Sequence, residues 1–158
     1  MSKDNPRVAV YGDIDELNGV VGLATSHLND NLLKEKLHTV QRHLFALGAQ
    51  LANPKEKTQR EKAEFSAKQV QYLEDEIDEM EKQLKPMKSF ILPGGVSAAA
   101  TLHIARSVAR RAERGLVALN ATDNLNPVFL HYINRLSDYL FVLARLVNHL
   151  NKTDDIKW

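Results

Sequence analysis

The chain has 158 residues, of which 44% are hydrophobic and 26% are charged, as in ordinary globular proteins of one domain. Its formal net charge of +1 gives no general attraction to nucleic acid, and the lack of cysteine excludes disulfide bonds and thiolate metal sites. No apolar run approaches the roughly 18 residues that span a bilayer, and the opening residues MSKDNPRVAVYG have no signal-peptide core. We therefore expect a cytoplasmic protein with no membrane and no nucleic-acid partner.

Two helices are predicted in the first third of the chain. Residues 1–11 are expected to form an extended lead-in, after which Asp13 caps the first helix and Glu16 completes a capping box. Apolar residues then recur at helical spacing to about Leu28. A second apolar stripe, from Leu33 to Leu51, predicts a helix that ends near an Asn-Pro pair.

Three more helices are predicted after a charged loop at residues 55–65. Ser66 is the predicted N-cap of the third helix, which is expected to stop at Pro86. A Pro-Gly-Gly turn at residues 93–95 supplies the backbone torsions for entry into the fourth helix. The apolar stripe of that helix continues to Leu119, a loop follows, and Pro127 opens the fifth helix.

Nothing in the sequence is typical of a strand. The expected fold is therefore all-α: one domain over residues 1–158, built as a five-helix bundle that is mostly antiparallel because the loops are short. The last helix also has a second face, made of Leu130, Asn134, Ser137 and Phe141, away from its main apolar stripe. This second face indicates contact with either another subunit or a ligand.

The fourth predicted helix carries a row of arginines, Arg106, Arg110 and Arg114, at positions i, i+4 and i+8. Like charges at this spacing repel by about 0.2–0.5 kcal/mol per pair. Either carboxylates from elsewhere neutralise the row or it binds an anion; the simpler alternative is a solvated face with local ion pairs. The Pro-Gly-Gly turn is likewise suited to anion binding by backbone amides, or is only a loop that enters a helix.

Two acidic patterns have simpler explanations. Asp13, Asp15 and Glu16 are mostly explained by capping and by the helix dipole. Glu35 and His38 match half of the pattern used by di-iron bundles, but they lie opposite the apolar stripe of their helix and the chain has no second copy. We therefore do not predict a di-iron centre.

Four segments of the chain carry a resemblance to a known family. They are YGDIDELNGVVGLA at residues 11–24, FILPGG at 90–95, LHIARSVARRAER at 102–114 and NRLSDYLFVLAR at 134–145. In this order and spacing, the sequence resembles the PduO-type ATP:cob(I)alamin adenosyltransferases over nearly its whole length. The resemblance implies a homotrimer with active sites between subunits. It also implies transfer of the 5′-deoxyadenosyl group of ATP to the cobalt of reduced cobalamin, with magnesium, to give adenosylcobalamin and triphosphate.

The resemblance implies site residues as well, position by position. Arg106 matches an arginine that pairs across the interface with the aspartate matched by Asp15, and both are expected to be catalytic together with Arg110. Phe90 matches the aromatic residue that excludes the lower axial base and leaves cobalt four-coordinate, and Phe141 is a second wall of that pocket. No protein ligand for a metal is expected. The expected ATP-binding residues are Lys3, Arg110, Arg111, Glu113, Arg114 and Asn134.

The sequence departs from the family in one respect, because the family has a phosphate loop of the form TGDxGxT ahead of the lysine, and this sequence begins MSKDNPRV without it. Much of the triphosphate and magnesium cradle belongs to that loop, whereas the fold and the trimer are expected to be independent of it. The resemblance implies an adenosylcobalamin-dependent client enzyme and a flavin reductase as partners. The alternatives are a non-catalytic carrier of cobalamin and a helical interaction or nucleic-acid module.

Overall fold

The fold consists of five helices in a computed structural model that describes residues 2, 5–52 and 65–158. The helices are α1 Pro6–Ser26, α2 Asn31–Ala52, α4 Ala67–Glu81, α5 Ser97–Asp123 and α6 Pro127–Leu150. Within these residues the only β pairing is an isolated antiparallel bridge between Ile91 and Lys157. The prediction of an all-α fold is confirmed. None of the described helices combines the length and the apolar character needed to cross a membrane.

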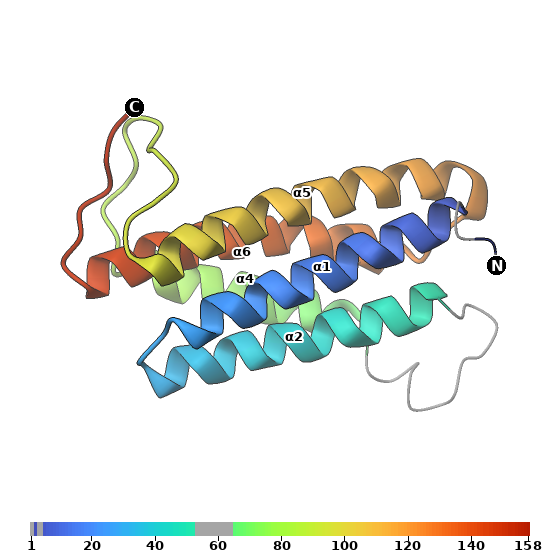
Figure 1. Cartoon of the computed structure of the whole chain (residues 1–158), viewed down its shortest axis with the longest axis horizontal. Helices are drawn as coiled ribbons and strands as arrows, with labels where there is room; N and C mark the ends of the chain where they lie inside the picture. Colours follow the sequence, from blue (N-terminus) through green and yellow to red (C-terminus); the bar gives the residue numbers. More distant parts are fainter. Residues whose placement is uncertain (1, 3–4, 53–64) are drawn as a thin grey trace.

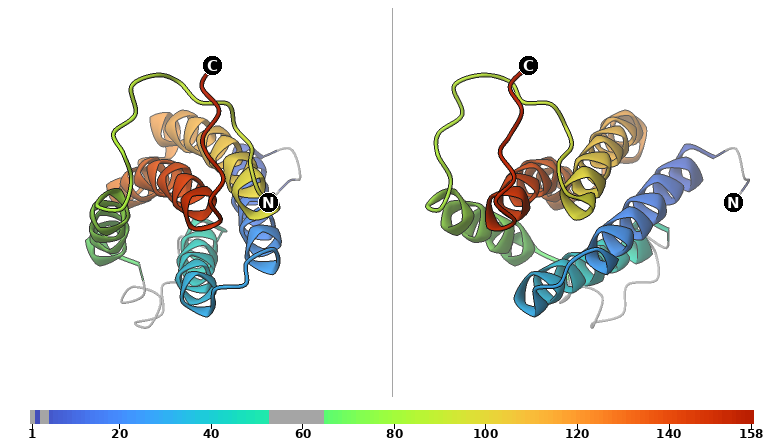
Figure 2. Two further views of the ribbon diagram at one scale, coloured as in Figure 1. Left: turned by 90° about the vertical axis from the view of Figure 1, so that its left-hand side faces the viewer. Right: turned by 60° about the vertical axis from the view of Figure 1, so that its left-hand side comes forward.

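The helices lie side by side along the long axis of the molecule (Figure 1). α5 packs against both α1 and α6, while α2 packs against α1 and α4 packs against α6. Consecutive helices run in opposite directions, whereas α4 and α6 run the same way (Figure 1). Viewed from one end, the five helices surround a common interior (Figure 2), which is filled by buried side chains such as Leu17, Leu44, Leu102 and Tyr132.

α1 begins well before the predicted start, so the extended lead-in and the cap at Asp13 are both wrong. The side chain of Asn5 accepts a hydrogen bond of 2.8 Å from the backbone N–H of Arg7, and Pro6 occupies the first turn. Proline is tolerated there because the N–H that it lacks would have no partner inside the helix. Asp13 and Glu16 consequently lie within α1, with their side chains available to other helices.

The other helix boundaries agree with the sequence more closely. Ser66 is the N-cap of α4, as predicted, and it also forms a capping box with Gln69. α4 ends at Glu81 rather than at Pro86, and α5 continues through Gly115 to Asp123. Gly115 lies where α1 approaches closely, because an added Cβ would be 2.9 Å from Val10 Cγ2. The predicted loop at residues 55–65 lies outside the described residues, apart from the buried Phe65.

Candidate functional site

The arginine row lies along α5, but its members differ in burial. Arg110 and Arg114 are exposed and Arg106 is half-buried. Within the described residues none of the three forms an ion pair. The Cζ atom of Arg106 lies 5.8 Å from the centre of the Phe141 ring on α6, and its Nε atom is buried without a hydrogen-bond partner in the described part of the chain. Burial, and secondly the charge of Arg110, lower the pKa of Arg106.

Arg111 lies next to the row in the sequence, but its side chain extends to α1. Its Nε lies 3.3 Å from the Oδ1 atom of Asp13, and its Nη2 donates to the Oε1 atom of Glu16. These two carboxylates therefore join α1 to α5 rather than cap α1. The role of Arg111 in ATP binding stays a prediction. The side chain already has two partners within the chain, Asp13 and Glu16.

Glu113 on α5 and Asn134 on α6 come together beside the arginine row. The Nδ2 atom of Asn134 donates a hydrogen bond of 2.9 Å to the Oε2 atom of Glu113. The structure thus brings together two residues that the family resemblance predicts to bind ATP, from positions 21 apart in the chain. Lys3, a third predicted ATP ligand, lies outside the described residues.

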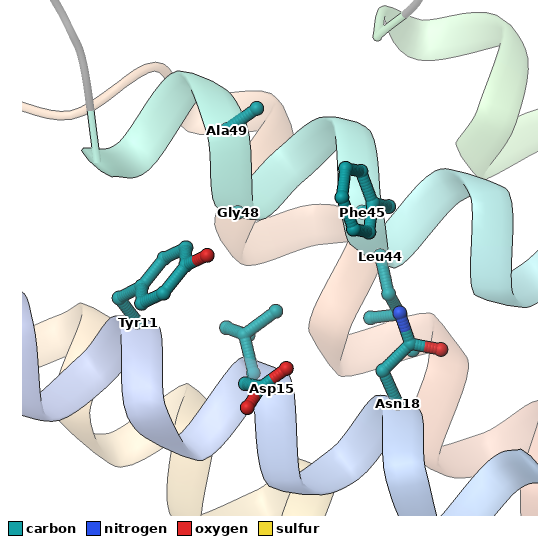
Figure 3. A pocket seen from close by; sticks show the side chains of 8 residues that line it. Tyr11, Asp15, Asn18, Leu44, Phe45, Gly48 and Ala49 are labelled. Carbon is teal, nitrogen blue, oxygen red and sulfur yellow. The ribbon is translucent and has the colours of Figure 1, made fainter.

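Asp15 is exposed on α1, on the side that faces α2. It lines a small cavity of about 50 Å³ together with Tyr11 and Asn18 of α1 and Phe45 and Gly48 of α2 (Figure 3). The cavity lies between the two helices, and within the described residues no ion pair joins Asp15 to Arg106 of the same chain. Phe45 itself is 74% exposed, so this side of the bundle presents an aromatic ring next to a carboxylate.

Phe141 and Phe90, the predicted cobalamin contacts, occupy different surroundings. Phe141 is half-buried between His103, whose ring centre is 5.8 Å away, and Arg106. It lines a cavity of about 560 Å³, whose other walls come from the end of α4, the middle of α6 and the segment that follows α4. Phe90 is 77% exposed, and its ring faces the indole of Trp158 at 6.5 Å.

The Pro-Gly-Gly turn is held by Asn148 of α6. Asn148 accepts a hydrogen bond of 3.0 Å from the Val96 N–H and donates one of 3.0 Å to the Gly94 carbonyl. Gly95 has φ of 107°, and an added Cβ would lie 2.2 Å from the Oδ1 atom of Asn148. The Val96 amide is therefore already used, which weakens the interpretation of the turn as an anion site. Sequence reasoning missed Asn148, although an amide among the apolar residues of a helix was an available signal.

The described residues offer no protein site for a metal ion, since they contain no cluster of three or more His, Cys, Asp or Glu side chains. Glu35 and His38 lie on the exposed side of α2, as predicted, and the Nδ1 atom of His38 is 3.3 Å from the Oε1 atom of Glu35. The side chains of the site are cations and hydrogen-bond donors on α5 and α6, next to aromatic rings. Such a surface suits the phosphates of a nucleotide and an apolar ring system.

Comparison with known proteins assigns this bundle to a class. The family model of cobalamin adenosyltransferase matches residues 1–147. The chain is 41% identical to the corrinoid adenosyltransferase of Bacillus subtilis, over 99% of this chain and 81% of that protein. It is 42% identical to the corrinoid adenosyltransferase PduO of Salmonella typhimurium, over 92% of this chain and 43% of that protein.

A solved structure agrees with these matches. It is a variant of the PduO-type ATP:corrinoid adenosyltransferase from Lactobacillus reuteri, complexed with cobalamin and ATP. That protein is 38% identical, with a TM-score of 0.88, and the match covers 100% of this chain and 88% of that chain. The chain belongs to the cobalamin adenosyltransferase family. The family and the enzyme class predicted from the sequence are confirmed.

Proposed function

We propose that this chain transfers the 5′-deoxyadenosyl group of ATP to the cobalt of cob(I)alamin, forming adenosylcobalamin and releasing triphosphate. Family membership supports this proposal. The structural observation that carries it is the exposed pair Arg110 and Arg114, which have no ion-pair partner among the described residues and lie beside the Glu113–Asn134 hydrogen bond. Two uncompensated guanidinium groups at this spacing are stabilised when an anion binds.

The proposed reaction needs no protein nucleophile. The electron pair of Co(I) attacks C5′ of the ribose, a cobalt–carbon bond forms, and the C5′–O bond breaks with its electron pair passing to triphosphate. Planar guanidinium groups bind phosphate oxygens in pairs, so Arg110 and Arg114 would hold the triphosphate as its charge increases. Glu113 and Asn134 would orient the nucleotide so that C5′ lies in line with the cobalt.

Magnesium is proposed as a companion of the nucleotide rather than as a protein-bound ion. The described side chains do not fit a magnesium site by themselves, because no three potential ligands cluster. Magnesium usually keeps several waters and binds substrate phosphates.

We further propose a homotrimer with active sites between subunits. Arg106 is a half-buried cation whose Nε atom lacks a partner in the described part of the chain, while Asp15 is an exposed carboxylate on another face. A charge removed from water is costly unless it is paired. An ion pair between Asp15 and the partner's Arg106 would supply that compensation.

Phe90 and Phe141 are proposed to form the apolar wall beside the corrin ring. An apolar surface at the lower face of cobalt excludes water and the lower axial base, which leaves Co(II) four-coordinate and easier to reduce. We propose a flavin reductase as the source of the electron and an adenosylcobalamin-dependent enzyme as the acceptor of the product. We place the reaction in the cytoplasm, which supplies the ATP.

Substitution of Arg110 tests this assignment. We expect Arg110→Ala to lower kcat/KM for ATP by about 100-fold, as loss of one transition-state donor does. Arg110→Lys should keep only part of the native kcat/KM, because an ammonium group cannot form the paired contact with phosphate oxygens. Arg42→Ala, which removes an exposed arginine of α2, is the matched control. Unchanged kinetics in Arg110→Ala would contradict the role of the arginine row.

A further inference from the structure

Phe90 lies in a segment that has little packing of its own. The segment runs from the end of α4 to the start of α5, and residues 85–90 within it are exposed. Phe90 is 77% exposed, so neighbouring side chains of its own segment do not fix its ring. A residue that must exclude a ligand from cobalt needs a defined position. The position of Phe90 must therefore be determined by contacts from elsewhere in the chain.

Those contacts come from the residues that follow α6. The backbone N–H of Trp158 donates a hydrogen bond of 2.9 Å to the carbonyl of Phe90, and the N–H of Leu92 donates one of 2.7 Å to the carbonyl of Ile156. Between them lies the antiparallel bridge of Ile91 with Lys157. Residues 90–92 and 156–158 thus form a short two-stranded contact, which Figure 1 shows at the end of the bundle opposite the start of α1.

The segment after α6 is itself fixed to the bundle. Arg145 of α6 holds Asp155 through an ion pair of 3.0 Å and donates a hydrogen bond of 2.9 Å to the carbonyl of Lys85. On the other side of Phe90, Asn148 holds Gly94 and Val96. Both flanks of Phe90 are therefore attached to the last turns of α6, which is a rigid support.

The side chains of Phe90 and Trp158 also meet. Their ring centres are 6.5 Å apart at an interplanar angle of 72°, an edge-to-face arrangement that aromatic pairs favour. Trp158 is 87% exposed and has no ring contact with any other described residue. Burial in the core therefore does not explain its position. Its contacts with the Phe90 backbone and ring do.

We propose that Trp158 is a positioning residue for Phe90: its amide fixes the Phe90 carbonyl, and its indole supports the Phe90 ring against the lower face of cobalamin. This inference rests on the proposed function, in which Phe90 excludes the lower axial base. It adds a role for residues 155–158, which lie beyond residue 147, where the family match ends. Trp158 does not itself touch the reacting atoms.

The test measures the fraction of four-coordinate Co(II) formed when ATP and cob(II)alamin are added to the whole chain, by electron paramagnetic resonance. We expect Trp158→Ala to lower this fraction by about threefold to tenfold, the range for loss of one edge-to-face aromatic pair. Trp158→Phe should restore most of it. ATP affinity should stay unchanged, and Leu32→Ala, which removes another exposed apolar side chain, should change neither quantity. An unaltered four-coordinate fraction in Trp158→Ala would overturn the inference.

A second readout separates this inference from the proposed function. Trp158 is the only tryptophan of the chain, so the indole N–H gives a single proton resonance. We expect Phe90→Ala to shift that resonance and Leu32→Ala to leave it in place. If the unmodified chain forms no four-coordinate Co(II), the proposed function fails, and the resonance alone decides whether the two rings are coupled. A resonance that Phe90→Ala does not move would overturn the inference.

Discussion

His43 shows how burial determines the charge of a single side chain in this bundle. Its Nδ1 atom lies 3.0 Å from the hydroxyl oxygen of Tyr132, and the rings of Tyr72 and Tyr132 meet it edge-on at 5.5 Å. Burial lowers the pKa of His43 from its ordinary value of 6.5 to about 4. The folded protein therefore holds this histidine neutral at pH 7, and the unfolded chain takes up a proton from about pH 6.5 downward.

We expect this difference to make the fold acid-sensitive. The stabilisation from a neutral His43 is complete above pH 6.5 and is lost as the pH falls toward 4, by about 2 kcal/mol for a half-buried group. Urea denaturation at pH 7 and pH 4.5 measures it, with His43→Gln as the variant that keeps a polar side chain but does not titrate. The variant should lose less stability between the two pH values. His103, whose pKa burial also lowers, titrates in both proteins and cancels from the comparison. Equal losses of stability in the native chain and in His43→Gln would contradict a lowered pKa of His43 as the cause.

The site residues show which roles a sequence can predict. Arg110 and Arg114 were identified because their spacing places like charges on one face of a helix, and the structure leaves both exposed. Arg111 has the same chemistry one position along, yet it pairs with Asp13 and Glu16. That pairing depends on how α1 is rotated against α5, which local spacing does not determine.

At the scale of the helix, the start of α1 carries a direct prediction. Asn5→Ala removes the acceptor for the Arg7 N–H and should lower the free energy of unfolding by about 1 kcal/mol, as loss of an N-cap does. Asn5→Ser should be nearly neutral, because serine also caps. Urea denaturation measures both. If Asn5→Ala has no effect, α1 does not begin where the structure places it.

The helices themselves were largely predictable because apolar residues at helical spacing define them. The helix boundaries were less predictable. The sequence from Val8 to Gly12 has little amphipathic pattern, so periodicity did not indicate the start of α1 at Asn5-Pro6. The segment that carries Phe90 was not predictable at all beyond its turn. Its conformation depends on pairing with residues 156–158, which are far away in the sequence. Periodicity contains no information on such a contact.

At the scale of the whole molecule, the proposed trimer places an ion pair between Asp15 and the partner's Arg106 at the interface between subunits. Sedimentation equilibrium should give three times the chain mass of 17.8 kDa. Arg106→Glu should dissociate the trimer because it would face Asp15 with a like charge, and Asp15→Arg in the same chain should restore it in part. Circular dichroism should show unchanged helicity in both variants. A monomeric native chain, or a trimer that Arg106→Glu leaves intact, would contradict the proposed interface.

The most direct test of the central claim is to follow adenosylcobalamin by its absorbance after mixing the chain with ATP, magnesium and chemically reduced cobalamin. The chain should be measured both with ATP and without it. We predict that adenosylcobalamin forms only when ATP is present, with one triphosphate released per product. If the chain binds cobalamin and forms no adenosylcobalamin, it carries cobalamin rather than modifies it, and the proposed function is wrong.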